Sequence, residues 1–480
     1  MAPGFHGRCW ETVFDNHLSQ APGFCKGRSK MNSAPRNASR QTRQDRAGSE
    51  TSARDRYPDA LRAGALLVVV FGHWIATLPR LENGLMTSTD HLLLVWTGAG
   101  VLTWVLQVVP LFVFVSAAVS ADGAQRRLEQ GHRQLHWWAG RALGLARPTV
   151  TYLAVLVAFV ILAAYTGGRL LGPLNHSLTV HLWFLMMLLG VQALLPLSVW
   201  ADRRWGLKAV AGLLLIAATV DVLRAGLATP ADLLELGTRV TGNGGGIGWL
   251  NAAVVWLLPQ QLGIAWKRGR FSGLGTGLAL LLLGLLWLAA AVASGYPVAM
   301  VDGAFGAPSN LLPPTLALVG VMWVQVGAVL ACEGPVRRLL ERRRVDRMVT
   351  ILGALGMPLY LWHKLAELPA AWLGERLGLP IDAGIPGEVG FWLGRLWWIL
   401  LCIVAVAPVM VAVVTFEMSR KRDVVSATGT PAILAGGAAL LGGIIVSLAL
   451  GALPGAIVGL AGVAAASWLL RAHPQPMRES

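Results

Sequence analysis

The stretch ALRAGALLVVVFGHWIATLP at residues 60–79 is long and apolar enough to cross a bilayer as one helix. Of the chain's 480 residues, 55% are hydrophobic and only 14% are charged, whereas soluble domains spend about a quarter of their residues on charge. We therefore predict an all-α fold, a polytopic transmembrane helical bundle. Further apolar runs of similar length lie near residues 92–119, 147–166, 182–199, 207–223, 247–266, 272–293, 311–332, 349–366, 391–416, 431–451 and 453–470.

Basic residues alternate in density between the connections that join these runs. Counted together with the charges within three residues of a run's end, the connections after the second, fourth, sixth, eighth and tenth runs hold twenty arginines and lysines, and the other connections hold six, Lys364 among them. Because basic loops stay on the cytoplasmic side, we predict a multi-pass plasma-membrane protein whose N-terminus and C-terminus are both cytoplasmic. The net charge of +15 is therefore explained by basic loops that lie next to the lipid bilayer. It does not indicate nucleic acid as a partner.

The apolar pattern divides the chain into three predicted regions. Residues 1–56 are basic and polar without an apolar period, which predicts a disordered cytoplasmic tail close to anionic lipid. Residues 57–420 hold ten runs and form the predicted working core. Residues 421–480 hold two uncharged runs rich in glycine and alanine, which predict an accessory transmembrane hairpin and a short cytoplasmic tail. The four cysteines show no metal-ligand spacing, so we predict no metal site.

Three histidines lie within the apolar runs. Arg62 and His73 are eleven residues apart, so they share a helix face and His73 lies roughly 16 Å deeper. Ionisable residues at such depth usually face a cavity or a partner. His363 enters from the same side to a similar depth, and His181 lies near the outer end of the fourth run. We expect these histidines to converge on a pocket whose candidate aromatic walls are Trp74, Trp183, Tyr360 and Trp362.

The same residues also have purely structural interpretations. Arg62 could be a snorkelling residue at the membrane interface, and a single histidine could simply be hydrogen-bonded between helices. Trp183 and Trp362 could equally be interface anchors, because tryptophan is enriched where helices leave the bilayer.

At these positions the chain resembles the family-3 membrane acyltransferases, most of all their actinobacterial branch. The resemblance covers about residues 56–420 and rests on an ordered set of motifs, each of them weak when it stands alone. It implies transfer of an acyl group, often acetyl, from acyl-CoA to a hydroxyl of a carbohydrate, lipid-linked or small-molecule acceptor, without a tightly bound cofactor. The motifs are Arg62-x10-His73, Pro110-Leu-Phe-Val-Phe-Val-Ser116, His181-Leu-Trp183-Phe-Leu185, Ser309-Asn310, Tyr360-Leu-Trp-His363 and Phe416-Glu417.

The residues and the resemblance together suggest roles for individual side chains. His73 is the candidate general base, since imidazole titrates in the range that this task needs, and His363 is the second catalytic candidate. Arg62 could hold a phosphate of CoA. The family's Arg-x-x-Arg pair is here spread over Arg141 and Arg147-Pro148, with one arginine displaced. The residues expected around the donor are Arg62, Asp59, Arg141 and Arg147, and those expected around the acceptor are His181, Trp183, Tyr360, Asn310 and Ser116.

Two other classes of protein remain open from the sequence. A transporter or flippase would show repeated halves and broken helices around a midplane site, and we find no clear half-to-half repeat. A membrane scaffold or sensor would not need three histidines at span positions.

Overall fold

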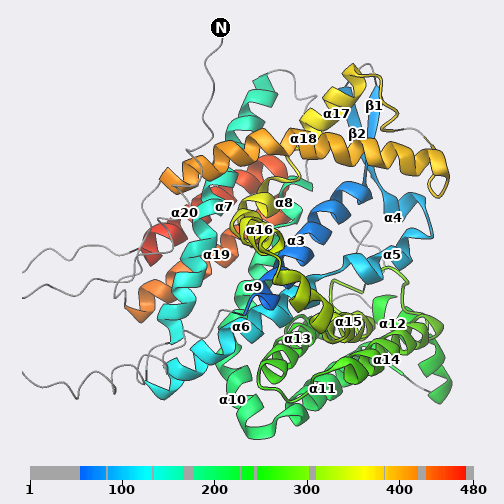
Figure 1. Ribbon diagram of the computed structural model, residues 1–480, viewed down its shortest axis with the longest axis vertical. Helices are drawn as coiled ribbons and strands as arrows, with labels where there is room; N and C mark the ends of the chain where they lie inside the picture. Colours follow the sequence, from blue (N-terminus) through cyan, green and yellow to red (C-terminus); the bar gives the residue numbers. More distant parts are fainter. Residues whose placement is uncertain are drawn as a thin grey trace, which may run out of the picture. The chain divides into compact units, whose positions relative to one another are not determined.

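The computed structural model describes residues 55–82, 85–131, 134–165, 177–227, 229–242, 246–301, 310–382, 384–419 and 429–471, which form a helical bundle with one small hairpin (Figure 1). The predicted tail at residues 1–56 lies outside the described residues except for Asp55 and Arg56. In chain order the elements are α3 (Tyr57–Ala76), β1 (Thr77–Glu82), β2 (Leu85–His91), α4 (Leu92–Val95), α5 (Ala99–Leu106), α6 (Val109–Glu129), α7 (Gln134–Tyr165), α8 (Ser177–Val180), α9 (Trp183–Ala193), α10 (Leu195–Trp205), α11 (Leu207–Ala225), η2 (Pro230–Glu235), α12 (Leu236–Gly242), η3 (Gly246–Leu250), α13 (Asn251–Lys267), α14 (Leu274–Ala293), α15 (Ala317–Leu340), α16 (Arg343–Trp362), α17 (Glu367–Arg376), α18 (Val389–Ser419), α19 (Thr430–Leu450) and α20 (Ala452–Leu470).

Helices lie on all of the apolar runs, and the polytopic helical bundle is confirmed. Among the described residues, seven helices are long and apolar enough to cross a membrane, and a pair bent by 48° could add an eighth. The predicted core of ten spans is therefore not established. Two helices that do not meet the length and hydropathy needed to cross a membrane show why. Helix α13 has only 17 residues, and α16 begins with a cluster of arginines. The seven are α3, the segment Ala99–Glu129, α7, α14, α15, α18 and α19, and the bent pair joins Leu178–Ala193 to α10.

The structure corrects the prediction between residues 77 and 108. The first helix ends at Ala76, before the predicted limit of 79, and β1 and β2 pair antiparallel, with Thr77 opposite His91. The second run is not continuous from residue 92, because it starts as the short α4 and is interrupted again between α5 and α6. The hairpin had a sequence signal, since Asn-Gly at residues 83–84 is typical of tight turns between strands.

Apolar packing holds the histidine-bearing helices together. Helix α3 packs against α16, α6 and α18, and the β-hairpin lies against α17 (Figure 1). One buried cluster contains Val70 of α3, Tyr152 of α7, Leu361 of α16 and Trp398 of α18. Burying such side chains stabilises the fold by roughly 1.5–3 kcal/mol each. The cluster therefore fixes the C-terminal half of α3 against the end of α16.

Helices α19 and α20 form a close pair that packs on α7. A side chain at Gly462 would have its Cβ 2.7 Å from the Cα of Gly443, so glycine permits the close approach of the two helices. Ile444 and Val463 from this pair belong to the same buried cluster as Tyr152. The buried core therefore continues from α7 into the α19–α20 pair.

The arginine asymmetry predicts which loops an impermeant thiol reagent can reach. Single cysteines placed at 225–242 or 295–301, in a protein otherwise free of cysteine, are expected to be labelled in intact cells. Cysteines at 121–131 or 341–347 are expected to stay unlabelled until the cells are opened, because basic loops are cytoplasmic. Labelling at 341–347 in unbroken cells would overturn this topology.

Candidate active site

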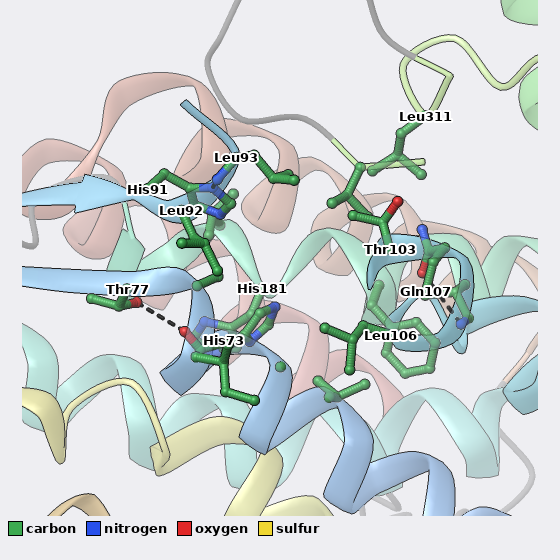
Figure 2. A pocket seen from close by; sticks show the side chains of 18 of the residues that line it. His73, Thr77, His91, Leu92, Leu93, Thr103, Leu106, Gln107, His181 and Leu311 are labelled. Atoms are coloured by element: carbon green, nitrogen blue, oxygen red, sulfur yellow. Dashed lines mark hydrogen bonds between the residues drawn. The ribbon is translucent and has the colours of Figure 1, made fainter. Parts of the chain in front are cut away.

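Three histidines from distant parts of the chain meet beside one cavity. His73 lies near the end of α3, His363 directly follows α16, and His181 lies between α8 and α9. The Nδ1 atom of His73 is 2.8 Å from the Nε2 atom of His363, and the two rings stack at 5.0 Å between centroids with 15° between their planes. The His181 ring centroid is 5.7 Å from that of His363, and Figure 2 shows His73 and His181 side by side.

The hydrogen bonds of this cluster determine where its protons lie. The Nδ1 atom of His363 is 2.7 Å from the carbonyl oxygen of Tyr360. A carbonyl only accepts, so this nitrogen carries a hydrogen, and the other nitrogen of a neutral His363 must accept from His73. The Nδ1 atom of His73 is then the donor, and its Nε2 keeps a free lone pair. His363 is fully buried, whereas His73 lines the cavity, so His73 is the one placed to accept a proton there.

Tryptophan and tyrosine side chains hold the backbone around the histidines. Trp74 Nε1 donates to the carbonyl oxygen of His363 at 3.0 Å. Trp398 Nε1 in turn donates to the carbonyl oxygen of Trp74 at 2.9 Å. The hydroxyl of Tyr360 donates to the carbonyl oxygen of His181. These bonds tie α3, α16, α18 and the start of α9 to one another within a turn of the histidines.

A buried ion pair lies next to His73. Lys364 Nζ is 2.8 Å and 3.0 Å from the two carboxylate oxygens of Glu367 and 2.9 Å from the Thr77 hydroxyl. That hydroxyl also donates to the carbonyl oxygen of His73 at 3.0 Å (Figure 2). Lys364 is 6% exposed and Glu367 is fully buried. The sequence analysis missed this pair, although Lys-x-x-Glu directly after His363 in an apolar region was a usable signal.

His91, which the sequence analysis also missed, reaches the cavity from the hairpin. Its Nδ1 accepts a hydrogen bond from the backbone N–H of Leu93 at 3.3 Å. Burial and the nearby Lys364 ammonium lower the pKa of His91 to about 4. His91 is therefore neutral at physiological pH, with its hydrogen on Nε2.

The cavity has a volume of about 390 Å³, and three of the predicted acceptor residues, His181, Trp183 and Tyr360, line it. Trp183 lies 6.2 Å from Trp256 between ring centroids. Trp362 is 4% exposed and contacts Tyr152 edge-on at 5.4 Å, so it belongs to the core.

The other two predicted acceptor residues do not line the cavity. Ser116 accepts a hydrogen bond from Gln192 Nε2 at 2.8 Å. Asn310 donates to the carbonyl oxygens of Pro297 and Ala299 at 2.6 Å and 2.9 Å. Asn310 therefore anchors the backbone directly before Leu311 and Leu312, which form part of the cavity wall.

The four predicted donor residues lie away from the cavity lining. Asp59 is 3.6 Å from the guanidinium of Arg56. Arg141 donates to Ser120 Oγ at 3.0 Å. Arg147 forms an ion pair with Glu417 at 3.3 Å. Arg62 is partly buried and lies on α3, eleven residues before His73.

Groups of acidic, cysteine and histidine side chains suited to a metal ion do not occur within the described ranges.

Comparison with protein families shows which family the chain belongs to. The family model described as the acyltransferase domain matches residues 55–414, which is most of the chain and carries all three histidines. The chain belongs to the family-3 acyltransferases. It is therefore a membrane acyltransferase that transfers groups other than aminoacyl groups. The sequence left three classes open: an acyltransferase, a transporter or flippase, and a scaffold or sensor. The family match shows that the acyltransferase is the correct one.

The matched region ends before α19 and α20. Searches among curated proteins and among solved structures return no match.

Proposed function

We propose that this acyltransferase moves an acyl group, with acetyl the first candidate, from cytoplasmic acyl-CoA to a hydroxyl group of an acceptor, with His73 as the general base. The acceptor is a carbohydrate, a lipid-linked molecule or a small natural product. The observation that carries the proposal is the 2.8 Å contact between His73 Nδ1 and His363 Nε2. With His363 Nδ1 held by the Tyr360 carbonyl oxygen, this contact leaves His73 Nε2 as an acceptor facing the cavity.

The proposed chemistry needs one proton to move twice. The His73 Nε2 atom takes the proton of the acceptor hydroxyl while the oxygen attacks the thioester carbonyl carbon, and a tetrahedral intermediate forms. The carbon–sulfur bond then breaks, and the imidazolium returns the proton to the departing CoA sulfur. During the step the charged His73 donates from Nδ1 to His363, which stabilises the imidazolium.

The two substrates are proposed to reach His73 from opposite sides. The Arg62 end of α3 is the cytoplasmic end in the proposed topology, so acyl-CoA would enter there with its thioester extended towards His73. The cavity lies at the other end of α3, with the β-hairpin residues Thr77 and His91 in its wall. The acceptor would enter from this outer side of the plasma membrane.

A transfer assay in proteoliposomes tests the proposal. Purified protein is supplied with radiolabelled acetyl-CoA and an extract of envelope lipids, glycans and small molecules, and labelled products are separated by mass. We expect a labelled ester that requires the protein, acyl-CoA and the extract. Slow hydrolysis of acetyl-CoA without extract serves as the background. Failure of every acyl-CoA tested to give a product with correctly folded protein would overturn the proposed donor.

Arg62 is expected to act on the donor. Arg62→Ala should raise the KM for acyl-CoA by roughly 10- to 100-fold, the effect of losing a hydrogen bond to a charged group. Arg62→Lys should restore part of the loss, because lysine keeps the charge but not the bidentate fork. Initial rates against acetyl-CoA concentration provide the measurement, with Arg80→Ala, on the outer hairpin, as the control. An unchanged KM would make Arg62 an interface residue.

A further inference from the structure

A basic segment covers the end of α15 and the start of α16, from Arg338 to Arg347. Helix α16 runs for 20 residues from Arg343, and His363 directly follows its last residue. At 1.5 Å per residue, the basic segment and His363 are roughly 30 Å apart along this helix. The segment therefore plays no part in the proposed proton transfer, and its charges require a separate explanation.

Acidic side chains beside the basic segment are paired with two other arginines. Arg337 lies 2.7 Å from a carboxylate oxygen of Asp55 and 2.9 Å from one of Glu333. Arg56 lies 3.0 Å from a carboxylate oxygen of Asp346. These three acids are therefore already neutralised by Arg337 and Arg56.

Five arginines of the basic segment are exposed and form no ion pair with any residue that the structure describes. They are Arg338, Arg342, Arg343, Arg344 and Arg347. Within the segment, the exposed Glu341 is the one remaining carboxylate that offsets their charge. Because like charges repel one another, guanidinium groups gathered in this way are stabilised by an anionic partner.

The exposed face of α16 changes from basic to apolar along the helix. Positions i, i+3, i+4 and i+7 share one helix face, and here they hold Arg344, Arg347, Met348 and Ile351. Met348 is 54% exposed and Ile351 is 39% exposed. The helical rise places Ile351 roughly 10 Å beyond Arg344 along the axis. A phospholipid has the matching order, with a phosphate followed by hydrocarbon chains.

We propose that the basic segment and the first turns of α16 form a binding site for an anionic phospholipid. The guanidinium groups of Arg344 and Arg347 bind the headgroup phosphate, for which their planar fork is suited. Met348 and Ile351 contact the upper part of an acyl chain, which a soluble phosphate lacks. The other arginines of the segment repel the ammonium of a zwitterionic headgroup, so a headgroup with net negative charge binds more tightly.

Lipid binding to the purified full-length protein in detergent tests this proposal. Native mass spectrometry counts the bound lipids while phosphatidylglycerol or phosphatidylcholine with identical acyl chains is added. Phosphatidylglycerol should bind roughly 5- to 25-fold more tightly, because each arginine near an anionic lipid contributes about a fivefold change. Calorimetric titration at increasing sodium chloride should show this preference shrinking, since salt screens exposed charges.

Charge-removing variants locate the preference on α16. The double variant Arg344→Gln with Arg347→Gln should bind the two lipids nearly equally. Arg344→Lys with Arg347→Lys should keep most of the preference, because lysine retains the charge without the bidentate fork. Arg126→Gln with Arg204→Gln is the matched control, since it removes two exposed arginines that lie outside the basic segment. The control should keep the preference, and the unfolding temperature of each variant checks its folding.

Three results would overturn the proposal. Equal binding of the two lipids by the native protein would exclude a site for anionic lipid. A preference that survives in the folded glutamine variant, or that falls equally in the control, would remove Arg344 and Arg347 as the binding residues. Displacement of phosphatidylglycerol by acetyl-CoA or by glycerol 3-phosphate would assign the arginines to a soluble phosphate. Since no product is measured, these failures are distinct from failure of the radiolabel assay, which tests the proposed function.

Discussion

Replacement of His73 by alanine is expected to lower the rate of acyl transfer by about 10²–10⁴-fold, the usual contribution of a general base. His73 lines the cavity, and its Nδ1 contacts His363. Without it the acceptor hydroxyl loses the base that the proposed mechanism assigns to its proton. The measurement is kcat in the proteoliposome assay at saturating acetyl-CoA, with folding checked by the unfolding temperature of the purified variant.

Two further variants separate loss of the base from loss of packing. His73→Gln keeps a polar group next to His363 but cannot take up the proton, so its rate should stay near that of the alanine variant. Val68→Ala removes volume from the same helix outside the cavity lining and should lower the rate by far less. Near-normal turnover by a well-folded His73→Ala protein would exclude His73 as the base.

The sequence predicted the membrane helices because hydropathy and basic residues act locally along the chain. The meeting of the three histidines was also predictable, since the side from which each run enters the bilayer fixes the depth of its histidine. In the structure His73 and His363 lie 2.8 Å apart between ring nitrogens, although they are 290 residues apart in the sequence. Depth along a helix thus predicted proximity but did not predict which ring nitrogens face one another.

The features that the sequence did not reveal depend on interruptions of helices and on partners far away in the chain. Residues 80–91 were assigned to a connection and residues 92–108 to one continuous run, so neither the hairpin with His91 nor the break between α5 and α6 was predicted. Lys364 was counted as a loop cation, whereas its partner Glu367 and the Thr77 hydroxyl bury it beside the cavity. Hydropathy averages over a window of residues, so it does not detect a single charge that is neutralised by tertiary contact.

Removal of Glu367 is expected to destabilise the protein by about 3–5 kcal/mol, the usual cost of leaving one partner of a buried ion pair alone. Glu367 is fully buried, and both of its carboxylate oxygens lie within 3.0 Å of Lys364 Nζ. Glu367→Ala would leave the ammonium with the Thr77 hydroxyl as its remaining partner at 2.9 Å. Reversible unfolding in mixed micelles of increasing denaturing detergent measures the change in free energy.

The decisive comparison is with the loss of both charges. The double variant Lys364→Met with Glu367→Leu should recover most of the stability lost in Glu367→Ala, because no unpaired charge remains in the core. Glu129→Ala provides the exposed control, since the Arg203–Glu129 pair has side chains 52% and 49% exposed and such pairs contribute about 0–1 kcal/mol. If Glu367→Ala were as mild as Glu129→Ala, the ammonium of Lys364 would have another source of stabilisation. The Thr77 hydroxyl that joins this pair to the His73 carbonyl oxygen would then hold α3 without help from Glu367.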